Sequence, residues 1–406
     1  MAPLLKWARC LLRRSPLRPL QFPATGFEVV PETELLEEEN YKEFKAGNYC
    51  PVNIGDVYAS NTYQVLGKLG FGSTSTVWLA RNLHNRGYFA LKVFKRNHYD
   101  TCKNEFQMYD SIEKANPSHP GHGHVRTAVG MFTMERQGQC YPCLVQPPMW
   151  DSWKDLLYRN PSDRFSVALL KGGLRHLLLA LDYLHTECKL VHTDIKADNI
   201  LHAIADKRIL ESFVKDEMES PSPRKFVNNT PIYMSRRFGL PREFEVVKGD
   251  VKRNHNAQPD VYRSPEVMLK AAWSYPIDVW NVGAMIWDVF EGGHLFHGLD
   301  PSPEKGYYTT RAHLAEIIGL LGPPPLDLLQ RGTRSGEFFS EDGQWIADCP
   351  IPQGNSLEKA ELVLAGRNKE MFLNFIKGML TWRPEDRKTP KQLLDDPWLQ
   401  SWEISD

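Results

Sequence analysis

Apolar and polar positions follow two periods along the chain and predict both helices and strands. Five leucines recur at helical spacing, which predicts a helix with one buried face: Leu174, Leu177, Leu178, Leu181 and Leu184. A polar helical stretch is expected over residues 101–113, and an apolar helix is expected to begin at Asp278. The short runs at residues 63–66 and 90–93 are instead typical of strands.

One polar run directly after the leucine-rich helix carries candidate chemistry. Residues 191–201 read VHTDIKADNIL and hold Asp194, Lys196 and Asn199. Phosphoryl transfer needs a carboxylate to accept the proton of the attacking hydroxyl, a cation to meet the phosphate and an oxygen to hold a metal. A tight loop can present all three groups together. The run resembles the catalytic loop of protein kinases, with Asp194 as proton acceptor, Lys196 on the γ-phosphate and Asn199 as metal ligand.

A glycine-containing run follows the first predicted strand. Residues 69–77 read LGFGSTSTV, close to the Gly-x-Gly-x-x-Gly-x-Val pattern in which a hairpin backbone closes over phosphates. Ser75 stands at the third glycine position. Such runs are also common in plain turns, so this run gains weight only from its neighbours. The residues of this run that are predicted to bind ATP are Leu69, Gly70, Phe71, Gly72, Ser73 and Val77.

The second predicted strand contains a candidate phosphate-binding lysine. Ala90 and Lys92 lie in ALKV, which resembles the kinase strand whose lysine contacts the α- and β-phosphates. Glu105 follows 13 residues later in the predicted polar helix and is a candidate ion-pair partner for Lys92. The alternative is a solvated lysine on a strand edge, but the flanking motifs favour an ATP site that includes Ala90, Lys92 and Glu105.

Three later segments extend the resemblance to protein kinases. They are DVYRSPEV at residues 260–267, DVWNVG at residues 278–283 and WRPEDR at residues 382–387. In kinases the aspartate of the second segment braces the catalytic-loop backbone. The first and third segments are joined there by an ion pair, so we expect a buried Glu266–Arg387 pair.

Further segments narrow the resemblance to the SR-protein kinases, and within them to the fungal branch. These segments are GNYCPVNIGD at 47–56, STVWLAR at 75–81, HTD at 192–194, QPDVYRSPE at 258–266 and WSY at 273–275. Serine at the third glycine position is usual in that family. The resemblance covers residues 41–402, nearly the whole chain.

The resemblance implies an α+β, bilobal protein-kinase fold. A small β-rich lobe would span residues 41–146 and a large helical lobe residues 147–402, with a short spacer insert at about 203–242. ATP and Mg²⁺ would bind between the lobes. The implied activity is that of a serine/threonine kinase, with Arg/Ser-rich protein substrates.

One expected element is absent from the sequence. No Asp-Phe-Gly or Asp-Leu-Gly follows Asn199, although FGLP at 238–241 and the later Gly-Asp suggest both flanks of the segment. We expect the strand and metal-binding aspartate between those flanks to be missing near residues 245–246. Asp250 is a poor substitute, because valine and lysine follow it. Asn199 alone would hold a hard cation weakly.

Two hypotheses stay open about the missing segment. The chain is either an active kinase that lost a short segment through a faulty gene prediction or splice form, or a pseudokinase that binds nucleotide or partners without efficient transfer.

The segment at the predicted hinge is also unusual, because relatives commonly have an aromatic and an acidic residue where Gln146 and Pro147 stand. Pro147 lacks a backbone N–H and removes one donor for adenine.

Composition excludes several other classes of protein. The 406 residues carry a net charge of −1, and no apolar run approaches the roughly 18 residues of a membrane span. We therefore expect no direct nucleic-acid or membrane partner, and a monomer. Cys140 and Cys143 lack a second pair to complete a zinc site, and they are interpreted as two strand thiols in a reducing compartment. A weaker metal hypothesis concerns three loop histidines, His119, His122 and His124.

The N-terminal extension, residues 1–40, raises a separate question. Residues 1–27 carry five basic residues and no acidic one, a composition typical of a mitochondrial transit peptide and equally of a disordered basic tail. The run Glu37–Glu39 is interpreted as part of a solvated linker. The family resemblance favours the cytoplasm or nucleus, whereas the basic extension raises mitochondrial targeting as an alternative.

Overall fold

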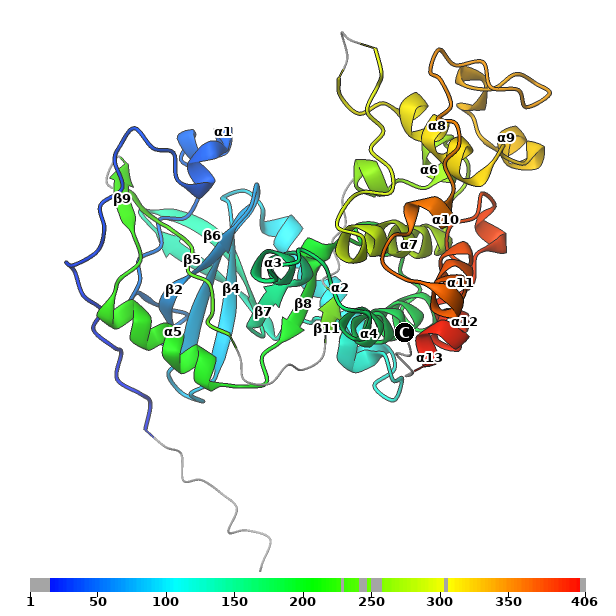
Figure 1. The fold of residues 1–406 in the computed structure, drawn as a ribbon. Helices are drawn as coiled ribbons and strands as arrows, with labels where there is room; N and C mark the ends of the chain where they lie inside the picture. The colour runs from blue at the N-terminus through cyan, green and yellow to red at the C-terminus, as the bar shows by residue number, and fades with distance from the viewer. Residues whose placement is uncertain (1–14, 228–229, 241–246, 250–257, 303–305, 402–406) are drawn as a thin grey trace, which may run out of the picture. The chain divides into compact units, whose positions relative to one another are not determined.

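A computed structural model describes residues 15–227, 230–240, 247–249, 258–302 and 306–401 (Figure 1). The chain divides into two compact units. The small unit comprises Met1–Asp110, Thr127–Met149 and Ile204–Glu243. The large unit comprises Ser111–Arg126, Trp150–Ala203 and Phe244–Asp406. The small β-rich unit and the large helical unit confirm the predicted α+β kinase-type fold.

The small unit is built on one antiparallel sheet with strand order β1-β2-β3-β4-β6-β5. Its strands are β1 (Val57–Tyr58), β2 (Tyr63–Phe71), β3 (Ser75–Asn82), β4 (Tyr88–Phe94), β5 (Gly130–Arg136) and β6 (Gln139–Gln146). Alternate residues face one core, which includes Trp78, Leu91 and Val145. The predicted polar helix is confirmed as α2 (Tyr99–Ala115).

The spacer forms ordered elements of the small unit, although the sequence assigned it to the large lobe. Its helix α5 (Arg208–Glu219) lies beside β2, where Phe213 fills the space above Gly67: a Cβ built there would meet the ring at 2.6 Å. The spacer continues as the hairpin of β9 (Arg224–Val227) and β10 (Thr230–Tyr233). Helix α5 buries Ile209, Leu210 and Phe213 together with the carboxylate of Glu217, which pairs with Arg236 of the spacer.

The segment before the first strand is also placed on the small unit. The backbone N–H of Leu17 donates to the carbonyl of Leu83, and that of Leu20 donates to the side chain of Gln64. The interpretation of Glu37–Glu39 as a solvated linker is wrong. These residues form the short helix η1 (Glu37–Asn40), and two of the three glutamates are buried because cationic side chains meet them.

Helices dominate the large unit. They are α3 (Trp153–Arg159), α4 (Val167–Thr186), α6 (Pro265–Met268), α7 (Pro276–Phe290), α8 (Thr310–Leu321), α9 (Leu326–Arg331), α10 (Leu357–Ala360), α11 (Gly366–Lys377), α12 (Pro390–Leu394) and α13 (Pro397–Gln400). The predicted leucine stripe is confirmed, since all five leucines of α4 are buried. The helix expected at Asp278 is α7, which is buried along nearly its whole length.

A three-stranded sheet supports the segment after the predicted catalytic loop. Its strands are β7 (Met149–Ser152), β8 (Ile200–Ala203) and β11 (Val247–Gly249), in the order β11-β8-β7. A short strand follows the spacer, because β11 pairs antiparallel with β8 and places Gly249 opposite Ile200. Residues 245, 246 and 250, where the sequence suggested the missing segment, lie outside the described residues.

No helix in the described part of the chain is both long enough and apolar enough to cross a membrane. Residues 1–14, which hold most of the basic N-terminal sequence, lie outside the described residues.

Candidate active site

The predicted catalytic loop lies in the large unit between α4 and β8. The side-chain amide of Asn199 donates from Nδ2 to the carbonyl oxygen and to Oδ2 of Asp194, each at 2.8 Å. Lys196 Nζ lies 3.9 Å from the other carboxylate oxygen of Asp194. The structure therefore brings together the three residues that the sequence predicted to act jointly. Asn199 is buried, while Asp194 and Lys196 are partly exposed.

A buried carboxylate holds the backbone of this loop. Asp278 accepts hydrogen bonds from the backbone N–H groups of His192 and Thr193 at 2.7 and 2.8 Å, and its Oδ2 lies 2.9 Å from His185 Nε2. Thr193 has φ +69°, a backbone conformation that is costly for a β-branched residue. The paired hydrogen bonds help to hold this conformation, so the predicted bracing contact is confirmed.

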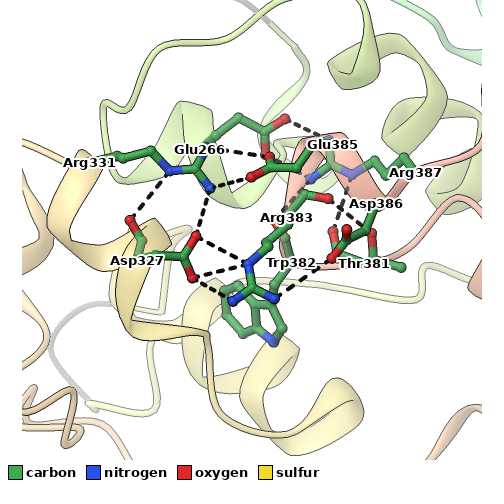
Figure 2. A network of polar contacts seen from close by, with 9 residues as sticks. All are labelled: Glu266, Asp327, Arg331, Thr381, Trp382, Arg383, Glu385, Asp386 and Arg387. Atoms are coloured by element: carbon green, nitrogen blue, oxygen red, sulfur yellow. Dashed lines mark hydrogen bonds and ion pairs between the residues drawn. The ribbon is translucent and has the colours of Figure 1, made fainter.

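The expected Glu266–Arg387 pair is confirmed as well (Figure 2). Two guanidinium nitrogens donate to the two oxygens of Glu266 at 2.6 and 2.8 Å, and both side chains are fully buried. Arg387 also donates to the carbonyl oxygens of Thr381 and Pro276. This two-point geometry fixes the start of α6 to the segment that precedes α12.

The small unit carries the predicted phosphate-binding lysine on β4. Lys92 Nζ lies 2.6 Å from Oε1 and 2.8 Å from Oε2 of Glu105 on α2, which confirms the expected ion pair. Both side chains are 15% exposed, and the ammonium also lies 4.8 Å from the centre of the Phe94 ring. A partly exposed ammonium that a carboxylate holds in place is suited to meet a phosphate.

The glycine-containing run forms the β2–β3 hairpin. The backbone N–H of Gly72 donates to the carbonyl of Ser75 at 2.8 Å, and the hydroxyl of Tyr49 donates to the carbonyl of Gly72. A Cβ at Gly70 would meet nothing within 4 Å, so packing inside the protein does not require glycine there. The missing side chain leaves room over the backbone, as a phosphate-covering hairpin needs. Ser75 is buried as the first residue of β3.

Strand register gathers three predicted ATP-binding residues on one face of the sheet. Val77 lies opposite Lys92, and Ala90 on the same strand as Lys92 lies opposite Leu79. Directly opposed residues of antiparallel strands point to the same face, as do residues two apart on one strand. Val77, Ala90 and Lys92 therefore share a face. Leu69, Phe71 and Ser73 lie in or next to the hairpin, where Phe71 and Ser73 are exposed.

The weaker metal hypotheses find no support. No cluster of three or more histidine, cysteine or acidic side chains that could hold a metal occurs in the described ranges. Cys140 is exposed and Cys143 is buried on β6, in accord with two separate strand thiols. His119 lies 3.3 Å from Asp182, while the ring of His124 stacks on that of His176.

Sequence reasoning missed a charged cluster that supports β2. Lys68 is fully buried; its ammonium donates to Glu38 and to the carbonyl of Tyr233, and it lies 2.7 Å from Glu37. Burial raises the pKa of Glu38, and the positive charge of Lys68 offsets part of this rise. Arg236 of the spacer donates its backbone N–H to the carbonyl of Lys68. The available signal was a lysine in a mostly apolar strand.

Comparison with known proteins decides the family. The protein kinase domain family matches residues 63–399. The chain belongs to the protein kinase family. A serine/threonine protein kinase of Aspergillus fumigatus is 38% identical over 399 residues, which cover 95% of this chain and 96% of that protein. The serine/threonine-protein kinase SRPK of Physarum polycephalum is 30% identical over 89% of this chain and 91% of its own.

Two further matches agree with this assignment. Protein kinase dsk1 of Schizosaccharomyces pombe is 25% identical, with 91% of this chain and 86% of that protein covered. A crystal structure of a kinase domain superimposes with a TM-score of 0.64 over 87% of this chain and 99% of its own, at 20% identity, which supports the fold alone. The kinase is thus a serine/threonine kinase of the SR-protein kinase family, and these relatives do not favour the pseudokinase hypothesis.

Proposed function

We propose that this kinase transfers the γ-phosphate of ATP to serine or threonine in Arg/Ser-rich proteins, with Asp194 accepting the proton of the substrate hydroxyl. The observation that carries the proposal is the convergence of Asp194, Lys196 and Asn199 in one braced loop. The substrate class is supported by relatives named SRPK and SRSF protein kinase 3; the human SRSF protein kinase 3 is 32% identical over 48% of this chain.

Each residue of the site has a distinct task in this proposal. Asp194 orients the attacking hydroxyl and takes its proton, and Lys196 stabilises the charge on the γ-phosphate. Lys92, positioned by Glu105, binds the α- and β-phosphates under the hairpin of residues 69–77. The apolar side chains of Val77 and Ala90 contact the base.

The metal site rests on Asn199. Its Nδ2 is committed to Asp194, so its carbonyl oxygen Oδ1 is the atom suited to a hard cation such as Mg²⁺. Bound Mg²⁺ would neutralise charge on the β- and γ-phosphates. Because Mg²⁺ in such enzymes takes phosphate oxygens as further ligands, we propose that it binds together with ATP and weakly without it.

A peptide-phosphorylation assay tests the substrate class. We expect the full chain to phosphorylate a peptide of alternating arginine and serine. A matched peptide in which glutamine replaces every arginine should be phosphorylated far more slowly. Equal rates on both peptides would contradict the proposed Arg/Ser preference while leaving the kinase activity intact.

The absence of Asp-Phe-Gly keeps a second candidate function open, that of a nucleotide-binding scaffold without efficient transfer. The two candidates are separated by comparing the chain with a variant that carries an inserted Asp-Phe-Gly segment between residues 245 and 246. Scaffold function predicts ATP binding with no measurable transfer by the chain as written. Transfer by the chain as written would contradict it, and a gain only on insertion would identify a lost segment.

We further propose that the protein acts in the cytoplasm or nucleus, as the SR-protein kinase relatives suggest, and that it acts as a monomer. The comparisons do not support the mitochondrial targeting that the basic N-terminus raised.

A further inference from the structure

The glycine-containing hairpin is tied to the segment that precedes the sheet, residues 41–50, which we call the lead-in segment. The hydroxyl of Tyr49 donates to the carbonyl oxygen of Gly72 at 2.8 Å. Earlier in the lead-in segment, the ring of Tyr41 packs against the ring of Phe71, with the ring centres 6.3 Å apart. Because Phe71 and Gly72 are neighbours, the lead-in segment contacts the hairpin at two consecutive positions.

The lead-in segment is itself anchored at the end of the strand that carries Lys92. The carbonyl oxygen of Asn48 accepts a hydrogen bond from the backbone N–H of Arg96 at 3.0 Å, and its Oδ1 accepts one from Nε of Arg96 at 2.6 Å. Arg96 lies just beyond the last residue of β4. Tyr49 directly follows Asn48, so its hydroxyl links the hairpin to the strand of the predicted phosphate-binding lysine.

The tyrosine is more rigidly held than the hairpin tip that it contacts. Tyr49 is 6% exposed, and its ring packs against Phe44 and below the ammonium of Lys95. Burial raises the pKa of Tyr49 above its usual range, so the hydroxyl keeps its proton and can donate. The tip residues Ser73 and Thr74 are exposed, although the carbonyl of Thr74 accepts from the backbone N–H of Lys95. An exposed tip gains little from packing, so its hydrogen bonds decide how far it moves.

We propose that Tyr49 is a positioning residue that holds the hairpin in the conformation that covers the nucleotide phosphates, and thereby sets the affinity for ATP. The inference rests on the proposed ATP site and adds a residue outside its motifs, which acts through Gly72. A hairpin that is held in place before ATP arrives loses less conformational entropy on binding. Without the hydroxyl, the binding conformation is less populated and the apparent affinity falls by the same fraction.

Equilibrium binding of ATP and of adenosine to the full chain tests the inference. Tyr49→Phe removes the hydroxyl and keeps the buried ring. It should bind ATP about threefold to tenfold more weakly than wild type, the range expected for one neutral hydrogen bond. Adenosine has no phosphates for the hairpin to cover, so its affinity should not change. Tyr58→Phe is the matched control, because it deletes a hydroxyl hydrogen bond to Asp56 in the same unit and should bind ATP as wild type does.

Hydrogen exchange without nucleotide provides a second measurement. The backbone N–H of Gly72 donates to the carbonyl of Ser75 within the hairpin. This amide should exchange faster in Tyr49→Phe than in wild type, whereas the amides of β5, at the edge of the sheet, should exchange at unchanged rates. Equally faster exchange in both places would show a general loosening of the unit and would overturn the inference.

The outcomes separate this inference from the proposed function. If wild-type protein binds ATP in a Lys92-dependent manner and Tyr49→Phe binds ATP equally well, the role of Tyr49 is refuted and the ATP site stands. An equal loss of affinity for ATP and adenosine would also refute it, because the phosphates would then play no part. If wild-type protein does not bind ATP, or if Lys92→Met leaves ATP binding unchanged, the proposed ATP site is refuted and the inference fails with it.

Discussion

Each unit buries an ion pair, and the two pairs differ in their balance of charge. In the large unit, one guanidinium meets one carboxylate in a two-point contact between Arg387 and Glu266. In the small unit, the single ammonium of Lys68 meets two carboxylates, those of Glu37 and Glu38. The first pair is neutral, whereas the second carries excess negative charge.

The difference shows what motif resemblance can predict. Glu266 and Arg387 are 121 residues apart, yet both lie in segments typical of kinases, and their contact was expected. Glu38 and Lys68 are 30 residues apart and lie outside any motif that the sequence analysis used. Their contact depends on how an N-terminal segment and a spacer fold onto the sheet.

The largest effect is expected from breaking the neutral pair. Arg387→Met leaves the fully buried carboxylate of Glu266 without a counter-charge and should lower the free energy of unfolding by about 3–5 kcal/mol. Urea denaturation measures this loss of unfolding free energy. Asp327→Asn, which breaks the half-exposed Asp327–Arg383 pair drawn beside it in Figure 2, is the control and should shift the midpoint little. Similar shifts for both variants would contradict the importance of burial.

A somewhat smaller loss is expected from the small unit. Lys68→Met removes the ammonium that contacts Glu37 and Glu38 and leaves the buried carboxylate of Glu38 without this counter-charge, so the free energy of unfolding should fall by about 3 kcal/mol. The spacer should also loosen, because the lost ammonium donates a hydrogen bond to the carbonyl of Tyr233 on β10. Hydrogen exchange of β9 and β10 reports that change. The exposed Lys103→Met is the control, and equal protection in both variants would show that Lys68 does not hold the spacer.

The large unit should respond to pH through a buried histidine on α8. Burial lowers the pKa of His313 to about 3, so the unfolded state takes up a proton before the folded state does. Stability is therefore lost as the pH falls below about 6.5, by about 2 kcal/mol between pH 7 and pH 5. In His313→Gln this part of the loss should disappear, whereas the exposed His297→Asn should retain it. Urea denaturation at pH 7 and pH 5 measures the free energy of unfolding of each variant and shows whether His313 causes this loss.

The small unit should respond to pH with the opposite sign. Because burial raises the pKa of Glu38 above its ordinary 4.5, the folded state holds this proton more tightly than the unfolded state does. The stabilising contribution is complete below pH 4.5 and is lost as the pH rises through the folded pKa. Relative to Glu38→Gln, wild-type protein should lose stability between pH 4 and pH 7. The exposed Glu32→Gln is the control; a parallel pH dependence of Glu38→Gln and wild type would contradict this sign.

The sequence predicted most of the scaffold of the site for a physical reason. Periodicity placed α4, and the fixed spacing of Asp194, Lys196 and Asn199 in one loop left little freedom in how they meet. The same holds for Lys92 and Glu105, where a strand and a helix follow each other directly.

The remaining contacts could not be predicted, because they depend on packing of segments that have no strong local pattern. The spacer looked polar as a whole, but α5 buries three apolar side chains, and one of them, Phe213, fills the space above Gly67. The strand β11 has three residues, too short for periodicity to reveal, and it forms through pairing with β8.

The central claim is that Asp194 carries phosphate transfer, and its direct test is the transfer rate of Asp194→Asn. At saturating ATP and Arg/Ser peptide, this isosteric variant should be slower than wild type by roughly 10²–10⁴-fold, because a general base is lost, while its affinity for ATP stays the same. The exposed Asp342→Asn should transfer at the wild-type rate. Wild-type transfer that Asp194→Asn leaves unchanged would contradict the account.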